Sequence, residues 1–193
     1  ILVDSLYGSW VQPLLANIRK LGFDPAEVKY VINTHGHFDH AGGSRYFQAI
    51  YGSRVVMTQE DWDLAQGRPE IPLFYMPAPE TDIVASDGDI IVLGDTTVEL
   101  FKTPGHTEGV LSLRYTVKDG AETYTAMTLG GVGLNFSGVE RTQSYIDSYQ
   151  RLQAMQDSIS VSLPNHAAVA SVFERAALLS QRTDGEPHPF VDA

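Results

Sequence analysis

The chain has 193 residues, of which 43% are hydrophobic and 19% charged, and its formal net charge at pH 7 is −11. This length fits a single globular domain over residues 1–193 with a sizeable core and a polar tail at residues 184–193. The acidic balance argues against general binding to nucleic acid or anionic membranes. No apolar run approaches the ~20 residues that span a bilayer. The absence of cysteine excludes disulfides, thiolate metal ligands and a cysteine nucleophile.

The first part of the chain predicts strands with helices between them. Residues 1–4 are apolar and predict a strand, and helical spacing over residues 10–21 predicts a helix with Ser9 as its N-cap. The same reasoning gives further strands at 29–33 and 54–58, and helices at 43–50 and 59–65. Residues 67–79 contain four prolines, which favours a packed connecting loop or an apolar lip over a site.

The middle of the chain is rich in predicted strands, and a strand and a helix end it. Short strands are expected at 82–85, 90–93 and 97–103, followed by a hairpin of 110–117 with 123–129. After a glycine-rich loop at 130–138, we expect a helix at 142–157, a strand at 159–163 and a helix at 171–181. The order predicts an α/β layered domain with helices outside the sheets.

Three of the six histidines fall within the run Thr-His-Gly-His-Phe-Asp-His at residues 34–40. Imidazole and carboxylate are ligands that zinc prefers. In extended backbone His35, His37 and Asp39 would project to one side, because side chains alternate along a strand. His40 would then point elsewhere, and the run therefore suits two metal ions better than one.

Ligands from distant parts of the chain must complete two such shells. His106, in Pro-Gly-His-Thr, and His166, in Leu-Pro-Asn-His, both follow predicted strand ends, where sites collect in layered folds. His188 lies between two prolines in the tail and is interpreted as a bystander. Asn33, Thr107 and Glu108 are candidate groups for orienting the imidazoles.

These motifs, in this order, resemble those of the metallo-β-lactamase superfamily, most closely the subclass B3 metallo-β-lactamases and their relatives. The resemblance covers residues 1 to about 181. It implies the αβ/βα four-layer sandwich. It also implies one zinc ion bound by His35, His37 and His106, and a second bound by Asp39, His40 and His166. Asp39 would also be catalytic, by orienting the nucleophile.

The chain departs from the family pattern in the segment Ala126–Gly131, which carries no metal-bridging aspartate of the kind found in glyoxalase-II-like members. Thr128 stands where B3 enzymes use serine to hold the substrate carboxylate, so Thr128, Asn135 and Ser137 are the predicted substrate-binding residues. The family also has strands before the one that resembles residues 1–4. We expect these strands to be missing from the protein or only from this sequence. If they are missing from the protein, an exposed sheet edge could pair two copies into a homo-oligomer.

The resemblance implies a zinc-dependent hydrolase. Hydroxide generated at the metals would attack an amide or ester carbonyl, such as that of a β-lactam ring. Three alternatives stay open: a lactonase or thioesterase on the same fold, a di-iron oxygenase or flavoprotein-linked reductase, and a non-catalytic metal-binding module. The partner would be a small-molecule substrate, with neither nucleic acid nor a membrane involved. The start of the chain does not reveal the compartment. A true B3 enzyme would be periplasmic or secreted, and another member would be cytoplasmic.

Overall fold

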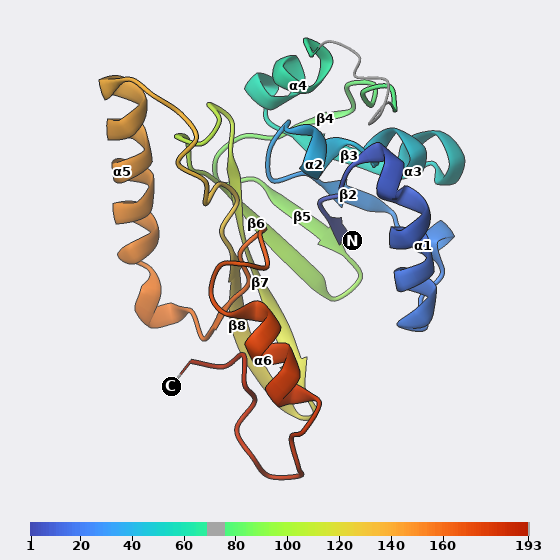
Figure 1. Ribbon diagram of the computed structural model, residues 1–193, viewed down its shortest axis with the longest axis vertical. Coiled ribbons are helices and arrows are strands. Elements are labelled where there is room, and N and C mark those ends of the chain that lie inside the picture. The colour runs from blue at the N-terminus through green and yellow to red at the C-terminus, as the bar shows by residue number, and fades with distance from the viewer. Residues whose placement is uncertain (69–75, 193) are drawn as a thin grey trace. The chain divides into compact units, whose positions relative to one another are not determined.

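The computed structural model describes residues 1–68 and 76–192, and the chain forms two compact units. Unit 1 comprises Ile1–Ser86 with Thr107–Leu111, and unit 2 comprises Asp87–His106 with Ser112–Ala193. Figure 1 shows the helices and strands of each unit. The chain therefore enters unit 2, returns briefly to unit 1 just after His106, and leaves it again.

Unit 1 contains a four-stranded sheet in which every pairing is parallel, in the order β1-β2-β3-β4. Residues of both faces of β2 and β3 are inaccessible to solvent, which is typical of a parallel sheet covered on both sides. The strands are β1 (Leu2–Val3), β2 (Tyr30–Ile32), β3 (Arg54–Met57) and β4 (Ile83–Val84). The connecting helices are α1 (Val11–Lys20), α2 (Phe38–Ala41), α3 (Ser44–Tyr51) and α4 (Gln59–Gln66), with short 3-10 turns η1 (Gly8–Trp10) and η2 (Pro25–Glu27).

The core of unit 1 forms where three helices pack on this sheet. Leu15 of α1, Phe47 of α3 and Trp62 of α4 are fully buried in one cluster with strand residues such as Val55. The indole N–H of Trp62 donates to the carbonyl of Ile83 in β4, 3.1 Å away, so this polar atom is satisfied inside the core.

The prediction that Ser9 caps the first helix is wrong. Ser9 lies inside the 3-10 turn η1, and α1 follows it with Trp10 at the N-cap position and no side-chain cap. A different cap forms at η2, where the carboxylate of Asp24 accepts a hydrogen bond from the backbone N–H of Ala26. The predicted end of α1 is confirmed, because Gly22 has a positive φ of 87°.

Unit 2 is built on a five-stranded sheet in the order β5-β6-β7-β8-β9. The pairs β5–β6 and β7–β8 are antiparallel, and β9 joins β8 in parallel. The predicted hairpin is confirmed: Asp119 pairs with Glu122 across a tight turn in which Gly120 has φ 60°. The strands are β5 (Ile90–Leu93), β6 (Thr96–Lys102), β7 (Leu111–Asp119), β8 (Glu122–Thr128) and β9 (Val161–Ser162).

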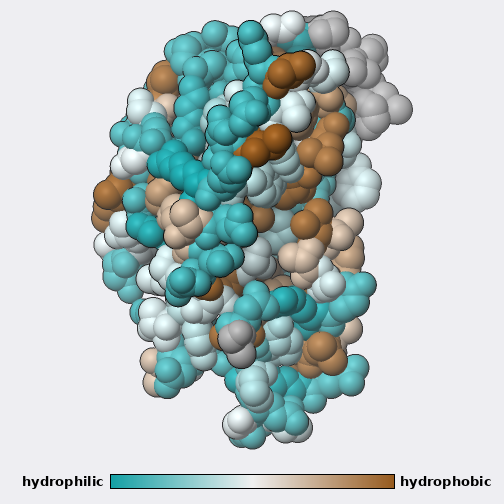
Figure 2. Space-filling view, turned by 90° about the vertical axis from the view of Figure 1, so that its left-hand side faces the viewer, coloured by the Kyte–Doolittle hydropathy of each residue, from teal (hydrophilic) through white to brown (hydrophobic). Residues whose placement is uncertain are grey.

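The long helix α5 (Val139–Gln153) begins earlier and ends earlier than predicted. The chain leaves the helix at Ala154, and a separate 3-10 turn, η3 (Gln156–Ser158), follows. Figure 2 shows the side of the molecule on which α5 lies, where the surface is mostly hydrophilic. The exposed large hydrophobic residues of α5 are Val139 and Ile146.

The C-terminal part of unit 2 contains the last helix, α6 (Val172–Leu179), and a tail that returns to the sheet. Val191 forms an antiparallel bridge with Val161 of β9, and the backbone N–H of Asp192 donates to the carbonyl of Ser160 at 2.8 Å. The tail, predicted only as a polar segment, therefore extends the edge of the sheet.

The predicted α/β class is confirmed by the two sheets and their helices. The predicted loop or lip at residues 67–79 lies mostly outside the described residues. Within the described parts of the chain, every helix is too short or too polar to cross a membrane.

Candidate metal centre

His35 and His37 face each other at the carboxyl end of β2. Nε2 of His35 lies 3.1 Å from Nδ1 of His37, and the two rings meet nearly edge-on. On the far side of the His35 ring, Nδ1 lies 3.1 Å from the hydroxyl oxygen of Thr34. That hydroxyl donates to the carboxylate of Asp4, so it accepts the Nδ1 proton of His35 and leaves Nε2 with a free lone pair.

The backbone that presents these histidines bends instead of extending, so the expectation of an extended run is wrong. The chain bends through Thr34–Gly36 and then enters α2, with His37 at its N-cap position. Gly36 allows this bend to lie against α4, because a Cβ atom there would be 2.3 Å from the carbonyl oxygen of Asp61.

Asp39 and His40 lie on the single turn of α2 and form a second pair of ligand atoms. Nε2 of His40 is 3.4 Å from Oδ2 of Asp39, and each residue offers one atom to a metal ion. The ring of His40 packs against the ring of His35 with a centroid distance of 4.0 Å. Unit 1 therefore brings four of the predicted site residues together.

Asp4 supports this cluster, and the sequence pattern did not identify it. Its Oδ2 atom accepts the Nδ1 proton of His40 at 2.7 Å, and its Oδ1 atom accepts the backbone N–H of Thr34 at 2.7 Å. Asp4 has φ 56°, in the left-handed region, which turns the chain just after β1. A carboxylate directly after an apolar strand was the only available signal.

These contacts shift the pKa values of both ligands on α2. Burial acts to raise the pKa of Asp39, but the hydrogen bond and charge of His40 lower it to about 2. Burial acts to lower the pKa of His40, but its hydrogen bonds to Asp39 and Asp4 raise it to about 9. His40 thus holds a proton between two carboxylates, in the position where a cation would be favourable.

His106 lies in unit 2, directly after β6, on a tight turn. Its Nδ1 atom is 2.9 Å from the carbonyl oxygen of Gly133. A carbonyl can only accept, so Nδ1 carries the proton and Nε2 is the nitrogen with a lone pair. Gly105 before it has φ 147°, which a residue with a side chain rarely adopts.

His166 follows β9 in unit 2, and its neighbour Asn165 is tied to the segment Leu129–Gly133. The backbone N–H of Asn165 donates to the carbonyl of Leu129 at 3.1 Å, and its side-chain amide donates to the carbonyl of Gly130. Because Gly133 also accepts from His106, the one segment Leu129–Gly133 supports the loops of both histidines.

The predicted substrate-binding residues differ in exposure. Thr128 ends β8, is buried, and its hydroxyl lies 2.9 Å from that of Tyr115. Asn135 and Ser137 are exposed on the loop before α5. The bystander His188 accepts a hydrogen bond from the backbone N–H of Phe190 in the tail.

The candidate orienting groups also differ. Asn33 is fully buried and accepts from Ser44, whose hydroxyl lies 2.8 Å from that of Ser5. Ser5 in turn donates to the backbone carbonyl of His40. Thr107 donates to the buried carboxylate of Asp61 at 2.9 Å instead of to an imidazole, and Glu108 is exposed.

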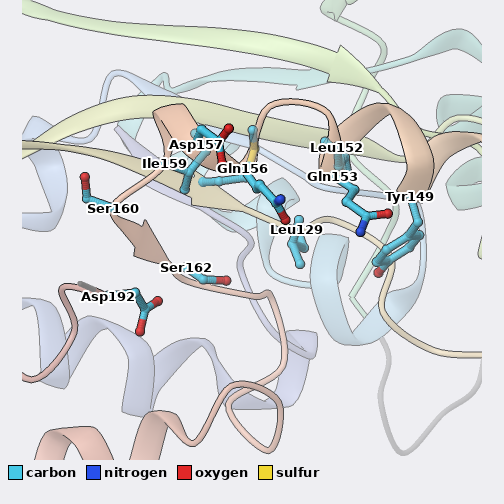
Figure 3. Close-up of a pocket in the computed structure, with 11 residues that line it drawn as sticks. Leu129, Tyr149, Leu152, Gln153, Gln156, Asp157, Ile159, Ser160, Ser162 and Asp192 are labelled. Carbon is cyan, nitrogen blue, oxygen red and sulfur yellow. The ribbon is translucent and has the colours of Figure 1, made fainter.

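Unit 2 also contains a cavity of about 720 Å³ between α5, η3 and the strands β8 and β9 (Figure 3). Apolar side chains such as Leu129 and Leu152 share its lining with polar ones such as Gln153 and Asp157. None of the predicted ligands is among its lining residues, so it is separate from the histidine loops described above.

Comparison with known proteins decides the family. The sequence profile of the metallo-β-lactamase superfamily matches residues 1–120, which contain the histidine run and His106. The chain belongs to the metallo-β-lactamase superfamily. Its predicted fold class is thereby confirmed, and the superfamily binds metal ions, typically zinc.

Relatives within the metallo-β-lactamase superfamily carry different names. The chain is 33% identical over 134 residues to the hydroxyacylglutathione hydrolase of Maricaulis maris (strain MCS10), covering 69% of this chain and 46% of that protein. It is 30% identical over 97 residues to an N-acyl homoserine lactonase of Bacillus sp., covering 50% of this chain and 36% of that protein. The chain spans about half the length of the hydroxyacylglutathione hydrolases that it matches.

A solved structure from the metallo-β-lactamase superfamily matches nearly the whole chain. BJP-1, a subclass B3 metallo-β-lactamase of Bradyrhizobium japonicum, superposes with a TM-score of 0.82 and 31% sequence identity. The match covers 98% of this chain and 75% of that one. The predicted resemblance to subclass B3 is confirmed at the level of the fold and of this identity.

Proposed function

We propose that the chain is a dizinc hydrolase that acts on a cyclic amide, with a β-lactam ring as its first candidate substrate. His35, His37 and His106 would hold one zinc ion, and Asp39, His40 and His166 would hold the other.

The observation that carries the proposal is the approach of Nε2 of His35 to Nδ1 of His37 at 3.1 Å. Two imidazole nitrogens with lone pairs repel one another at this distance unless a proton or a cation lies between them. The other nitrogen of His35 is already engaged by Thr34. The donor set is nitrogen and oxygen only, which fits zinc in a catalytic site.

The neighbours of the proposed ligands fix which nitrogen each imidazole would offer. Asp4 engages Nδ1 of His40, and the carbonyl of Gly133 engages Nδ1 of His106, so both rings would offer Nε2. The two contacts come from different units, and each orients its histidine within its own unit.

Zinc, when bound, lowers the pKa of a coordinated water toward ~7 and polarises a carbonyl oxygen. The chain would add a carboxylate, Asp39, which is ionised at neutral pH because its pKa is about 2. Asp39 would accept a hydrogen bond from the attacking water and orient it. Its partner His40 would give up the proton that it holds between Asp39 and Asp4 when the metal binds.

A thioesterase or lactonase is the second candidate function. The hydroxyacylglutathione hydrolase relative, at 33% identity, and the lactonase relative, at 30%, favour it. The segment Ala126–Gly131, which carries no acidic residue, favours the B3-like candidate, because a metal-bridging aspartate is expected there in glyoxalase-II-like members. We therefore place β-lactams first and thioesters and lactones second.

The test combines metal content and turnover on one purified sample. We expect two zinc ions per chain and hydrolysis of a penicillin or a carbapenem in preference to a lactone or a thioester. His106→Ala and His166→Ala should each reduce bound zinc and abolish turnover, whereas His188→Ala, the matched control, should change neither.

Each departure from this result has a distinct meaning. Full turnover with unchanged zinc in His106→Ala or His166→Ala contradicts the ligand assignment. Preferred hydrolysis of the thioester or lactone replaces the first candidate with the second. Metal uptake without hydrolysis of any of the four substrates favours a non-catalytic metal-binding module.

A further inference from the structure

The first turn of α5 holds the backbone of the His106 loop through one side chain, that of Arg141. The Nε–H of Arg141 donates to the carbonyl of Gly105 at 2.7 Å, and its Nη2 donates to the carbonyl of His106 at 3.2 Å. A guanidinium presents several N–H groups in a fixed plane, so two carbonyls engaged by one fork are held in a defined relative orientation.

The ring of His106 is oriented from its other side by a segment that α5 also holds. Its Nδ1–H donates to Gly133, and the hydroxyls of two tyrosines of α5 reach the carbonyls just before Gly133. Tyr145 donates to Val132 at 3.4 Å and Tyr149 to Gly131 at 3.3 Å, with their rings stacked at 4.5 Å. Backbone and ring of His106 are thus both referenced to one helix.

Close packing shows that this turn cannot move independently of the helix. A Cβ atom on Gly105 would lie 2.6 Å from Cβ of Tyr145. Ser148, one turn further along α5, donates to the carbonyl of Pro104 at 2.7 Å. Arg141 therefore completes a row of contacts along α5 that fixes the backbone from Pro104 to His106.

We propose that Arg141 is a positioning residue that sets the direction of the Nε2 lone pair of His106 and thereby tunes metal affinity. The inference rests on the proposed function in taking His106 as a ligand. Losing a group that orients a metal-bound histidine typically weakens metal affinity about 10–100-fold. Loss of Arg141 should weaken one of the two metal sites by a factor in this range.

Arg151 provides a matched control, because it lies on the same helix and makes a similar set of contacts elsewhere. Its guanidinium contacts both carboxylate oxygens of Asp87 at 2.8 and 3.1 Å and the carbonyl of Lys102 at 3.3 Å. Neither partner belongs to a histidine loop. Arg151→Met removes the same charge and the same number of atoms as Arg141→Met.

The first measurement is competitive titration of the metal-free protein with Co²⁺ against a chromophoric chelator, with thermal unfolding recorded alongside. Arg141→Met should weaken one Co²⁺ site about 10–100-fold and alter its visible absorption, while Arg151→Met binds as the wild type does. Arg141→Lys, which keeps the charge but not the planar fork, should fall between wild type and Arg141→Met. It also serves if Arg141→Met does not fold.

The second measurement needs no metal: ¹⁵N histidine spectra of the metal-free protein report which ring nitrogen of His106 carries the proton. We expect a proton fixed on Nδ1 in wild type and Arg151→Met, and a mixture of tautomers in Arg141→Met or Arg141→Lys. Unchanged Co²⁺ affinity and an unchanged tautomer in the Arg141 variants would overturn the inference. Wild type that takes up no Co²⁺ would overturn the proposed function instead, and the spectra would still test Arg141.

Discussion

The carboxylate of Asp4 and the imidazole of His40 are 36 positions apart in the chain and 2.7 Å apart in the fold. Asp4→Asn should keep the shape of this contact but remove its charge. Because partners of this kind orient the ring and raise its basicity, zinc affinity at the proposed Asp39–His40 site should fall about 10–100-fold. Competition with a chelator measures it. Asp24→Asn, which removes a carboxylate that caps η2, is the control and should leave zinc affinity unchanged.

Gly105→Ala should destabilise the protein. The new Cβ atom would lie within 2.7 Å of three atoms of Tyr145, and φ at this position is 147°. Backbone strain and overpacking each cost about 1–3 kcal/mol, so the free energy of unfolding should drop by at least that much. Urea denaturation measures it. Gly88→Ala, at φ 83° with no atom within 4 Å of the added Cβ, isolates the strain and should cost less.

Asp87 should contribute stability that depends on pH. Partial burial acts to raise its pKa, but hydrogen bonds from Arg151 and from the backbone N–H of Lys102 lower the pKa of Asp87 below its ordinary 3.8. The folded state therefore binds the proton less tightly than the unfolded chain does. The contribution is fully present above pH 3.8 and is lost as the pH falls through the lowered folded value.

The corresponding test compares Tm of wild type and Asp87→Asn across this pH range. Wild type should be more stable at neutral pH by up to about 1 kcal/mol, since the pair is partly exposed. The difference should vanish in strong acid. In an Arg151→Met background, Asp87→Asn should lose most of its effect. A Tm difference that is constant with pH would contradict the assignment to this carboxylate.

Zinc should stabilise the folded chain if it binds as proposed. A ligand present at 100 times its dissociation constant adds about 2.7 kcal/mol to the free energy of unfolding when it binds only the folded state. Tm should therefore rise with zinc and fall again with a chelator. His35→Ala should reduce the zinc-induced rise, and His188→Ala should not. An equal rise in all three proteins would indicate binding unrelated to the proposed ligands.

The sequence was most informative where the chemistry is local. The run at 34–40 places two pairs of ligands within one short segment, and the structure keeps both pairs in contact. Most strands and helices were predicted to within a few residues, because their burial follows the period of the hydrophobic pattern. The helix α5 was displaced in the prediction, since Val139 follows a glycine-rich loop and carries no capping signal.

Contacts that depend on rare backbone conformations or on tertiary approach could not be predicted. Asp4 reaches His40 only because Asp4 and Leu6 adopt positive φ values of 56° and 59°, which non-glycine residues seldom do. Arg141 meets Gly105 across 36 positions, and no periodicity links them. The bridge from Val191 to Val161 is one residue pair long and leaves no alternating pattern.

The shared support of two histidine loops by Leu129–Gly133 has a practical consequence for protein engineering. Insertions or grafted loops meant to change substrate preference should begin at Leu134, which is 71% exposed, and leave the preceding carbonyls in place. A library that randomises the supporting carbonyl row would change the geometry around His106 and His166 together, and would select for repaired metal loading before any change in specificity.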